Sequence, residues 1–193
     1  MAERSRVERS VNADFEMPLA GWRSLFARLA DGDPEALETL YDVSARTLYG
    51  LALWRTGSKE DAADVVQGVF LRLAERRNRL INVEDPRAWL LAVTHRAAVD
   101  FCRRRSVRRT ESLDVCAYLT APAEDPDREM DARRASRLLE ELSAEQRSVI
   151  YLHHYAGNTF EEVGKALGIP QFTAASRYRQ GVKKLRELLE GKR

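Results

Sequence analysis

The sequence is poor in the residues that build disulfide-bonded or metal-bound scaffolds. Only 2 cysteines occur in 193 residues, Cys102 and Cys116, so a disulfide framework and a four-cysteine zinc site are both excluded. Long apolar runs are also missing: the longest stretch without Asp, Glu, Lys or Arg covers only residues 148–160 and cannot span a bilayer. The charged N-terminus lacks the apolar run of a secretory signal. We therefore expect a reduced, cytoplasmic setting and no membrane insertion.

Signatures of catalysis and cofactor binding are equally scarce. The chain contains no Gly-rich phosphate loop, no HExxH pair and no arrangement typical of a nucleophilic triad. Two of its 3 histidines, His153 and His154, are adjacent, so they would lie on different faces of a helix and make a poor metal pair. We predict that the chain is not an enzyme and that it uses no metal or other cofactor.

Turn-forming residues are few, with 10 Gly and 6 Pro, whereas Leu and Ala greatly outnumber the β-branched residues. Helix starts are well marked. They are DPE at 33–35, which offers an N-cap followed by proline, SKED at 58–61, which resembles a capping box, and full capping boxes SAEQ at 143–146 and TFEE at 159–162. Apolar residues recur at helical spacing after these signals. The sequence predicts an all-α protein.

Charge is distributed in blocks that divide the chain, although the net charge is only +2. Residues 110–132 carry seven acids, one arginine and two prolines with little periodicity, which indicates a flexible acidic linker. Four amphipathic helices fit into residues 18–109, after an N-terminal tail at 1–17, and a second helical unit occupies residues 133–193. We expect two small helical domains joined by this linker.

Residues 159–180 have the spacing of a helix-turn-helix. Gly164 is small where two helices would cross, Gly168 suits a left-handed turn, and Ile169 would insert beneath that turn. The second helix would bury Ala174 and Tyr178, while side chains near its start can reach base edges in the major groove. The residues expected to face DNA are Gln171, Phe172, Thr173, Ser176, Arg177 and Arg179. A helical hairpin with a solvated basic face remains an alternative.

Basic residues gather at two places in the first domain. The segment 103–109 holds five arginines at the end of a predicted helix, where they could bind phosphates or simply add favourable charge at the helix C-terminus. The loop RRNRLIN at 76–82 is basic with an apolar tip, so it could hold an unstacked base. Both features point to nucleic acid as a partner.

Three stretches together are similar to the extracytoplasmic-function (ECF) sigma factors of bacterial RNA polymerase. They are DAADVVQGVFLRL at 61–73, RAWL at 87–90, and Gly168-Ile169 followed by Thr173 and Ser176-Arg177. The resemblance covers about residues 19–191 and includes both domains in the family's order. It implies that the first domain corresponds to sigma region 2 and the second to sigma region 4.

The resemblance implies a sigma factor that binds core RNA polymerase and directs promoter-specific transcription initiation. Asp61, Asp64 and Gln67 would dock on the clamp helices of the large catalytic subunit, and a further contact is implied with the flap of the other large subunit. The first domain would recognise and melt the minus-10 element, and the second would read the minus-35 element of promoter DNA. The implied minus-10 residues are Arg76, Asn78, Arg79, Leu80, Asn82, Arg96, Arg103, Arg104 and Arg105. The linker would thread the polymerase channel, and an anti-sigma factor is an expected partner.

The sequence departs from the family pattern at three positions that bear on these contacts. Gly68 stands where members often have Glu, Pro170 where Ser is frequent, and Ala175 where Lys is frequent. The promoter sequence and part of the polymerase contact are therefore expected to differ. Two other functions stay open: a sigma-like decoy that binds an anti-sigma factor without reading DNA, and a simple helix-turn-helix regulator. The arginine blocks argue against the decoy, and the first domain and linker argue against the regulator.

Overall fold

The computed structural model describes Phe15, residues 17–105 and residues 137–190, with the side chain of Arg105 excepted. In chain order the elements are α2 (Leu19–Ala30), α3 (Pro34–Thr56), α4 (Lys59–Glu75), the 3-10 helix η2 (Arg77–Asn82), α5 (Pro86–Arg105), α8 (Ala144–Ile150), the π-helix η3 (Tyr151–Tyr155), α9 (Phe160–Leu167) and α10 (Gln171–Glu190). The acidic linker predicted at 110–132, most of the predicted tail at 1–17 and Cys116 lie outside the described residues.

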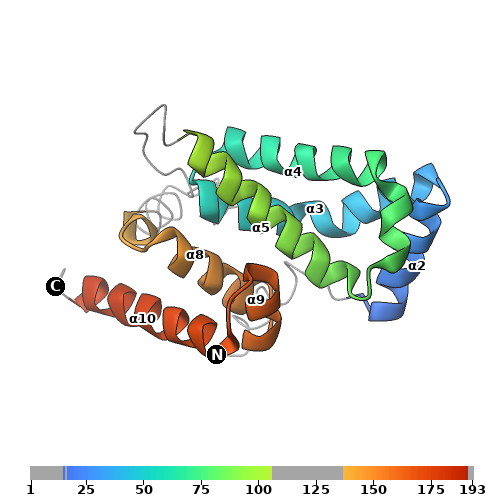
Figure 1. Ribbon diagram of the computed structural model, residues 1–193. Coiled ribbons are helices and arrows are strands. Elements are labelled where there is room, and N and C mark those ends of the chain that lie inside the picture. Colours follow the sequence, from blue (N-terminus) through green and yellow to red (C-terminus); the bar gives the residue numbers. More distant parts are fainter. Residues whose placement is uncertain (1–14, 16, 106–136, 191–193) are drawn as a thin grey trace, which may run out of the picture.

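The described part of the chain is helical and contains no strand, which confirms the all-α prediction (Figure 1). None of its helices combines the length and the apolar character needed to cross a lipid bilayer.

The predicted capping residues lie at the starts of four helices. Side-chain caps at α3, α4, α8 and α9 come from Asp33, Ser58, Ser143 and Thr159, and the last two complete reciprocal capping boxes. Burial raises the pKa of Glu162 in the α9 box, but the hydrogen bonds from Thr159 and the charge of Arg87 outweigh it and hold the pKa below its usual value.

The helices α2 to α5 form the first unit, in which α3 packs against both α4 and α5 (Figure 1). α2 lies across one end of this unit and contacts η2 and α3. Side chains from all four helices are buried in its core, including Trp22, Leu40, Val69 and Leu91. Apolar side chains of the four helices therefore meet in one core, and the polar faces of α4 and α5 are left available at the surface.

The second unit contains the predicted helix-turn-helix, formed by α9 and α10. Gly168 has a φ of 67°, in the left-handed region that a side chain would disfavour. A Cβ at Gly164 would lie 2.7 Å from Ile169 O, so only glycine allows this close approach of the backbone. Ala174 is fully buried, as predicted, whereas Tyr178 and Ile169 are only half-buried against the core. The turn inferred from residues 159–180 is thus present.

His153 has a packing role in this unit. Its ring stacks on Phe160 with centroids 4.0 Å apart, meets Tyr178 edge-on at 4.7 Å, and places Nδ1 2.8 Å from Asn158 O. His154 instead meets Tyr155 edge-on. Among the described residues, no group of three or more His, Cys, Asp or Glu side chains could hold a metal ion.

The two units contact each other directly, which the sequence did not predict. α8 packs against α3, and α9 packs against α5 (Figure 1). Arg147 of α8 is only 6% exposed and connects the two units. Its Nε donates a hydrogen bond to Trp54 O of α3 at 2.9 Å, and its Nη1 donates to Leu142 O at 2.7 Å and Leu139 O at 3.4 Å.

Further polar contacts surround this junction. Tyr151 Oη donates to Thr47 O at 3.1 Å, Arg55 Nη1 pairs with Glu145 Oε1 at 2.9 Å, and Arg87 Nη1 pairs with Glu162 Oε1 at 3.3 Å. Burial and the nearby charge of Arg55 lower the pKa of His95 on α5 to about 4, and Arg177 of the second unit adds to this effect. His95 is therefore neutral at physiological pH.

Candidate nucleic-acid and polymerase interfaces

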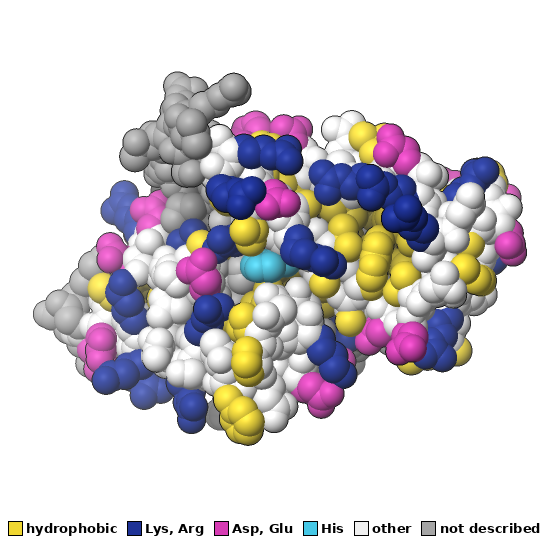
Figure 2. Space-filling view, viewed as in Figure 1, with side chains coloured by type: hydrophobic (Ala, Val, Ile, Leu, Met, Phe, Trp, Pro, Cys, Tyr) yellow, Lys and Arg dark blue, Asp and Glu magenta, His cyan; other side chains and the backbone are white. Residues whose placement is uncertain are grey.

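An arginine-lined pocket opens where α4, η2 and α5 meet. Its volume is about 410 Å³, and Arg72, Arg76, Arg79 and Arg96 line it together with Trp89. Figure 2 shows basic side chains along the edge of a hydrophobic patch on the face that α5 crosses in Figure 1. Positive charge beside an aromatic ring suits an unstacked base and its neighbouring phosphates. We call this feature the arginine pocket.

The basic loop predicted to hold an unstacked base is the short helix η2. Leu80 is only 3% exposed and lines both the arginine pocket and a second pocket of about 500 Å³ against α2. The exposed apolar tip is instead Ile81, with 61% of its surface open. The polar members of the loop are all exposed, and they are Arg76, Arg77, Asn78, Arg79 and Asn82. The structure therefore places Leu80 in the wall of the pockets rather than on the open surface.

The implied minus-10 residues of α5 fall into two groups. Arg96 belongs to the arginine pocket, and its Nε donates a hydrogen bond to Ala92 O at 3.2 Å, which holds the side chain along the helix. Arg103 and Arg104 are exposed near the C-terminal end of α5, about two turns beyond Arg96. For Arg105 the structure describes only the backbone, at the last position of the helix.

Sequence reasoning missed Arg72 and Trp89 as members of the arginine pocket. Arg72 precedes Arg76 by four residues, so the two arginines are neighbours near the end of α4. On α5, Trp89, Arg96 and Asp100 follow one another at helical spacing and all line the pocket. Trp89 is only half-buried, so part of its ring is open to the pocket. The helical spacing between Trp89 and Arg96 was the sequence signal that could have identified Trp89 as a member of the pocket.

The outward face of α4 presents two of the three residues implied in polymerase binding. Asp64 and Gln67 are exposed and lie three residues apart, hence side by side on the helix. Asp61 is only 9% exposed in the first turn of α4, so it contributes little to this open face. The residues predicted to turn inward, Val65, Val66, Val69 and Phe70, are all buried.

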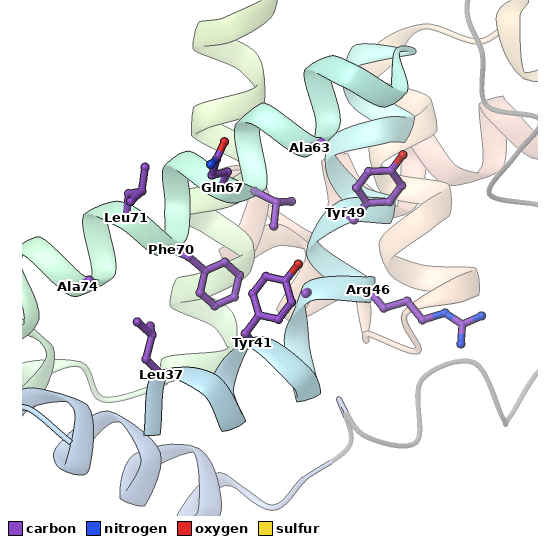
Figure 3. A pocket seen from close by; sticks show the side chains of 11 residues that line it. Leu37, Tyr41, Arg46, Tyr49, Ala63, Gln67, Phe70, Leu71 and Ala74 are labelled. Atoms are coloured by element: carbon purple, nitrogen blue, oxygen red, sulfur yellow. The ribbon is translucent and has the colours of Figure 1, made fainter. Parts of the chain in front are cut away.

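An apolar groove of about 690 Å³ lies between α3 and α4, next to the polar face just described (Figure 3). The rings of Tyr41 and Phe70 meet in it with centroids 5.0 Å apart, and Gln67 and the 57% exposed Leu71 also line it. A Cβ at Gly68 would meet no atom within 4 Å. Packing within the chain therefore does not require a glycine at this departure from the family pattern.

The residues predicted to face DNA differ in exposure along α10. Those that are exposed are Gln171, Phe172 and Arg179, and those that are only partly exposed are Thr173, Ser176 and Arg177. The charge of Arg177 contributes to the lowered pKa of His95, so Arg177 lies near α5 of the first unit. All six side chains were expected to face outward, and three of them are only partly exposed.

Comparison with known proteins connects both units to one family. The Sigma-70 region 2 family matches residues 40–108, and the Sigma-70 region 4 family matches residues 138–187. The ECF RNA polymerase sigma factor SigL of Mycobacterium tuberculosis is 31% identical over 166 residues, which cover 83% of this chain and 93% of SigL. The chain belongs to the ECF RNA polymerase sigma factors. It is thus a promoter-directing initiation factor, a class without enzymatic activity, consistent with the prediction that the chain is not an enzyme.

Other relatives show how far the likeness extends. SigE of Mycolicibacterium smegmatis, another ECF sigma factor, is 33% identical over 172 residues, which cover 83% of this chain but 65% of SigE. This sigma factor therefore spans about two thirds of that relative. Two solved structures share the fold at 23% identity: CnrH in complex with the cytosolic domain of CnrY (TM-score 0.64, covering 88% of this chain and 97% of that one), and RpoE from Bartonella quintana with the anti-sigma factor NepR (TM-score 0.62, covering 81% and 96%).

Proposed function

We propose that this sigma factor binds core RNA polymerase through the exposed face of α4 and captures the unstacked minus-10 strand in the arginine pocket. The observation that carries the proposal is the pocket itself, in which four arginines and Trp89 converge within the segment matched by Sigma-70 region 2. Asp64 and Gln67 would contact the clamp helices of the large catalytic subunit. We place the protein in the cytoplasm because its proposed partner, RNA polymerase, works there.

Strand opening in this proposal is driven by binding energy. An unstacked base is stabilised by the aromatic and apolar pocket wall, and the arginines neutralise the phosphates on either side. The exposed Arg103 and Arg104 extend the basic surface along α5 toward neighbouring phosphates. The sequence holds no nucleotide-binding loop, so no ATP-driven step is part of the proposal.

The remaining partners are assigned to the second unit and the linker. The helix-turn-helix would read the minus-35 element, while the same unit would contact the flap of the second large polymerase subunit. The linker at 110–132 would pass through the nucleic-acid channel. An anti-sigma factor is a further proposed partner, since RpoE, which shares the fold, was solved with the anti-sigma factor NepR. The domain boundaries 18–109 and 133–193 stay predictions.

The arginine pocket also bears on the two alternative functions. A decoy that only binds an anti-sigma factor has no need of four arginines around an aromatic side chain. A simple regulator that binds duplex DNA would need only α10, so the pocket and the exposed face of α4 would have no function in it. Run-off transcription with purified core polymerase on a promoter library separates the three. Specific starts behind shared upstream elements support the sigma factor, whereas absence of both starts and polymerase binding contradicts it.

Replacing Arg96 by alanine is expected to weaken binding of the holoenzyme to a fork-junction probe with a single-stranded minus-10 element. We expect a loss of about 1–3 kcal/mol and a salt slope reduced by about one counterion, because a phosphate-binding charge leaves the pocket. Titration of the probe at several salt concentrations measures both. Arg137→Ala removes an exposed arginine of the second unit and should change neither value. Equal affinities for Arg96→Ala and the unaltered protein would refute the pocket assignment.

Gln67→Ala is expected to weaken binding to core polymerase in the absence of DNA, about three- to tenfold, because an amide at the contact loses its hydrogen bonds. Affinity can be measured by titrating labelled sigma factor with core enzyme. Glu75→Ala changes another exposed residue of α4, at its C-terminal end, and should bind normally. Gln67 is exposed, so the circular dichroism spectrum of the variant should not change. If both variants bind core polymerase equally well, the contact lies elsewhere.

A further inference from the structure

Among the described residues, Phe172 is the most exposed large hydrophobic side chain. It is 77% exposed, compared with 61% for Ile81 and 57% for Leu71. Single exposed apolar residues are common and need no explanation by themselves. The location of this one is what matters, because it lies in the first turn of α10, immediately after the helix-turn-helix turn.

The buried side of α10 fixes the direction of Phe172. Ala174 and Gly181 are buried and Tyr178 is half-buried, at spacings of four and three residues that define one helix face. Phe172 precedes Ala174 by two residues, a rotation of about 200° around the helix. Its ring therefore projects from the side of α10 opposite the core.

The same outward side of α10 continues with polar and basic residues. Ser176, Arg179 and Lys183 follow Phe172 at steps of four, three and four residues, so all lie on one stripe. Arg179 and Lys183 are exposed, and Lys183 Nζ lies 3.7 Å from Glu187 Oε1. An apolar tip thus heads a stripe that becomes basic along the helix.

This stripe has the chemistry of a major-groove surface. Among the base edges in that groove, the one apolar group is the C5-methyl of thymine, and phenylalanine is among the side chains that contact it. Phosphates border the groove and accept contacts from Arg and Lys. An apolar contact at the start of the helix, with basic residues about two and three turns further on, fits duplex DNA better than an apolar protein surface.

We propose that Phe172 is a specificity residue that contacts the C5-methyl group of a thymine in the minus-35 element. This inference rests on the proposed function, because it needs α10 to enter the major groove of promoter DNA. It assigns to Phe172 a preference for thymine over uracil and over cytosine at one position. The neighbouring Gln171 and Arg179 have other chemistry and carry no methyl preference.

Uracil substitution tests the contact directly, because deoxyuridine differs from thymidine only by the missing methyl group. The holoenzyme first selects duplexes from a promoter library randomised across the minus-35 region. Each thymine of the selected element is then replaced singly by deoxyuridine, and affinity is measured by titration. We expect one position at which uracil weakens binding about three- to tenfold.

Variants then connect that position to the side chain. Phe172→Ala should bind the thymine duplex with the reduced affinity and show no further loss with uracil at the sensitive position. Phe172→Leu should keep part of the methyl preference, and Gln171→Ala should keep all of it. Because Phe172 is exposed, none of these changes should alter the folded state.

The possible failures are distinguishable. A selected element without a constant thymine, or a flat uracil scan from a holoenzyme that still initiates transcription, overturns the methyl contact alone. The same holds if Phe172→Ala loses affinity equally on both duplexes, or if it loses affinity for core polymerase without DNA, which would make its partner a protein. If the holoenzyme selects no duplex and initiates nowhere, the proposed function fails, and this inference fails with it.

Discussion

Arg147→Ala is expected to lower the free energy of unfolding by about 3 kcal/mol, because it removes the buried side chain that joins the two units. Arg147 donates hydrogen bonds to three backbone carbonyls, one of which, Trp54 O, belongs to the last turn of α3. Carbonyls in that turn have no partner within their own helix, and a cation beside them is favourable. Alanine would take this donor away from Trp54 O and Leu142 O, while Leu139 O would keep the hydrogen bond from Leu142 N.

Urea unfolding followed by far-ultraviolet circular dichroism measures this loss. Arg55→Ala is the matched control, because it removes an arginine at the same junction whose ion pair with Glu145 is partly open to solvent. That control should lose about 1 kcal/mol or less. Arg147→Lys should fall between the two, since an ammonium group keeps the charge but cannot reach several carbonyls with a fixed fork. A loss below 1 kcal/mol for Arg147→Ala would mean that the carbonyls find water instead.

Local signals explain why so much of the fold could be predicted from the sequence. The caps at Asp33, Ser143 and Thr159 act on the residues next to them, and each appears in the structure as predicted. The same is true of the turn, where Gly164 and Gly168 satisfy constraints set within ten residues of chain. Motifs of this kind carry their own geometry, so no knowledge of distant contacts is needed.

The contact between the units could not be predicted in this way. Arg147 stands inside an apolar stripe, and its burial depends on the carbonyl of Trp54, 93 residues earlier in the chain. Arg177 is half-buried, and its charge contributes to the lowered pKa of His95 in the other unit, neither of which periodicity predicts. Periodicity identifies the face that a helix buries, but it does not identify the element that covers that face.

The candidate site could be predicted only in part, because it too depends on contacts between elements that are distant in the sequence. The stretches 76–82 and 61–73 were identified by composition and resemblance, and both lie at the surface features now described. The pocket itself joins three elements, so Arg72 of α4 and Trp89 of α5 became members only when these helices were packed. On the polymerase face the structure instead removes a predicted member. Asp61 belongs to the same motif as Asp64, but it is buried at the start of α4.

Gly164→Ala and Gly68→Ala are expected to change stability in opposite directions, although both replace a helical glycine by the same residue. A Cβ at Gly164 would lie 2.7 Å from Ile169 O and 3.3 Å from Gln171 N, both of them backbone atoms of the turn. The turn would have to open, which costs about 2–3 kcal/mol. At Gly68 the Cβ meets nothing within 4 Å, so alanine should add about 0.5–1 kcal/mol through its better helix propensity.

Thermal and urea unfolding of the two variants and of the unaltered protein measure these two changes in stability. Gly181→Ala serves as an intermediate case, because its Cβ would lie 2.8 Å from Ile150 Cδ1, the flexible end of a side chain that can turn away. Gly164→Ala should also lose affinity for minus-35 DNA, since it displaces the first residues of α10, whereas Gly68→Ala should keep it. A stable Gly164→Ala protein with normal DNA binding would mean that the turn tolerates a wider crossing than the structure shows.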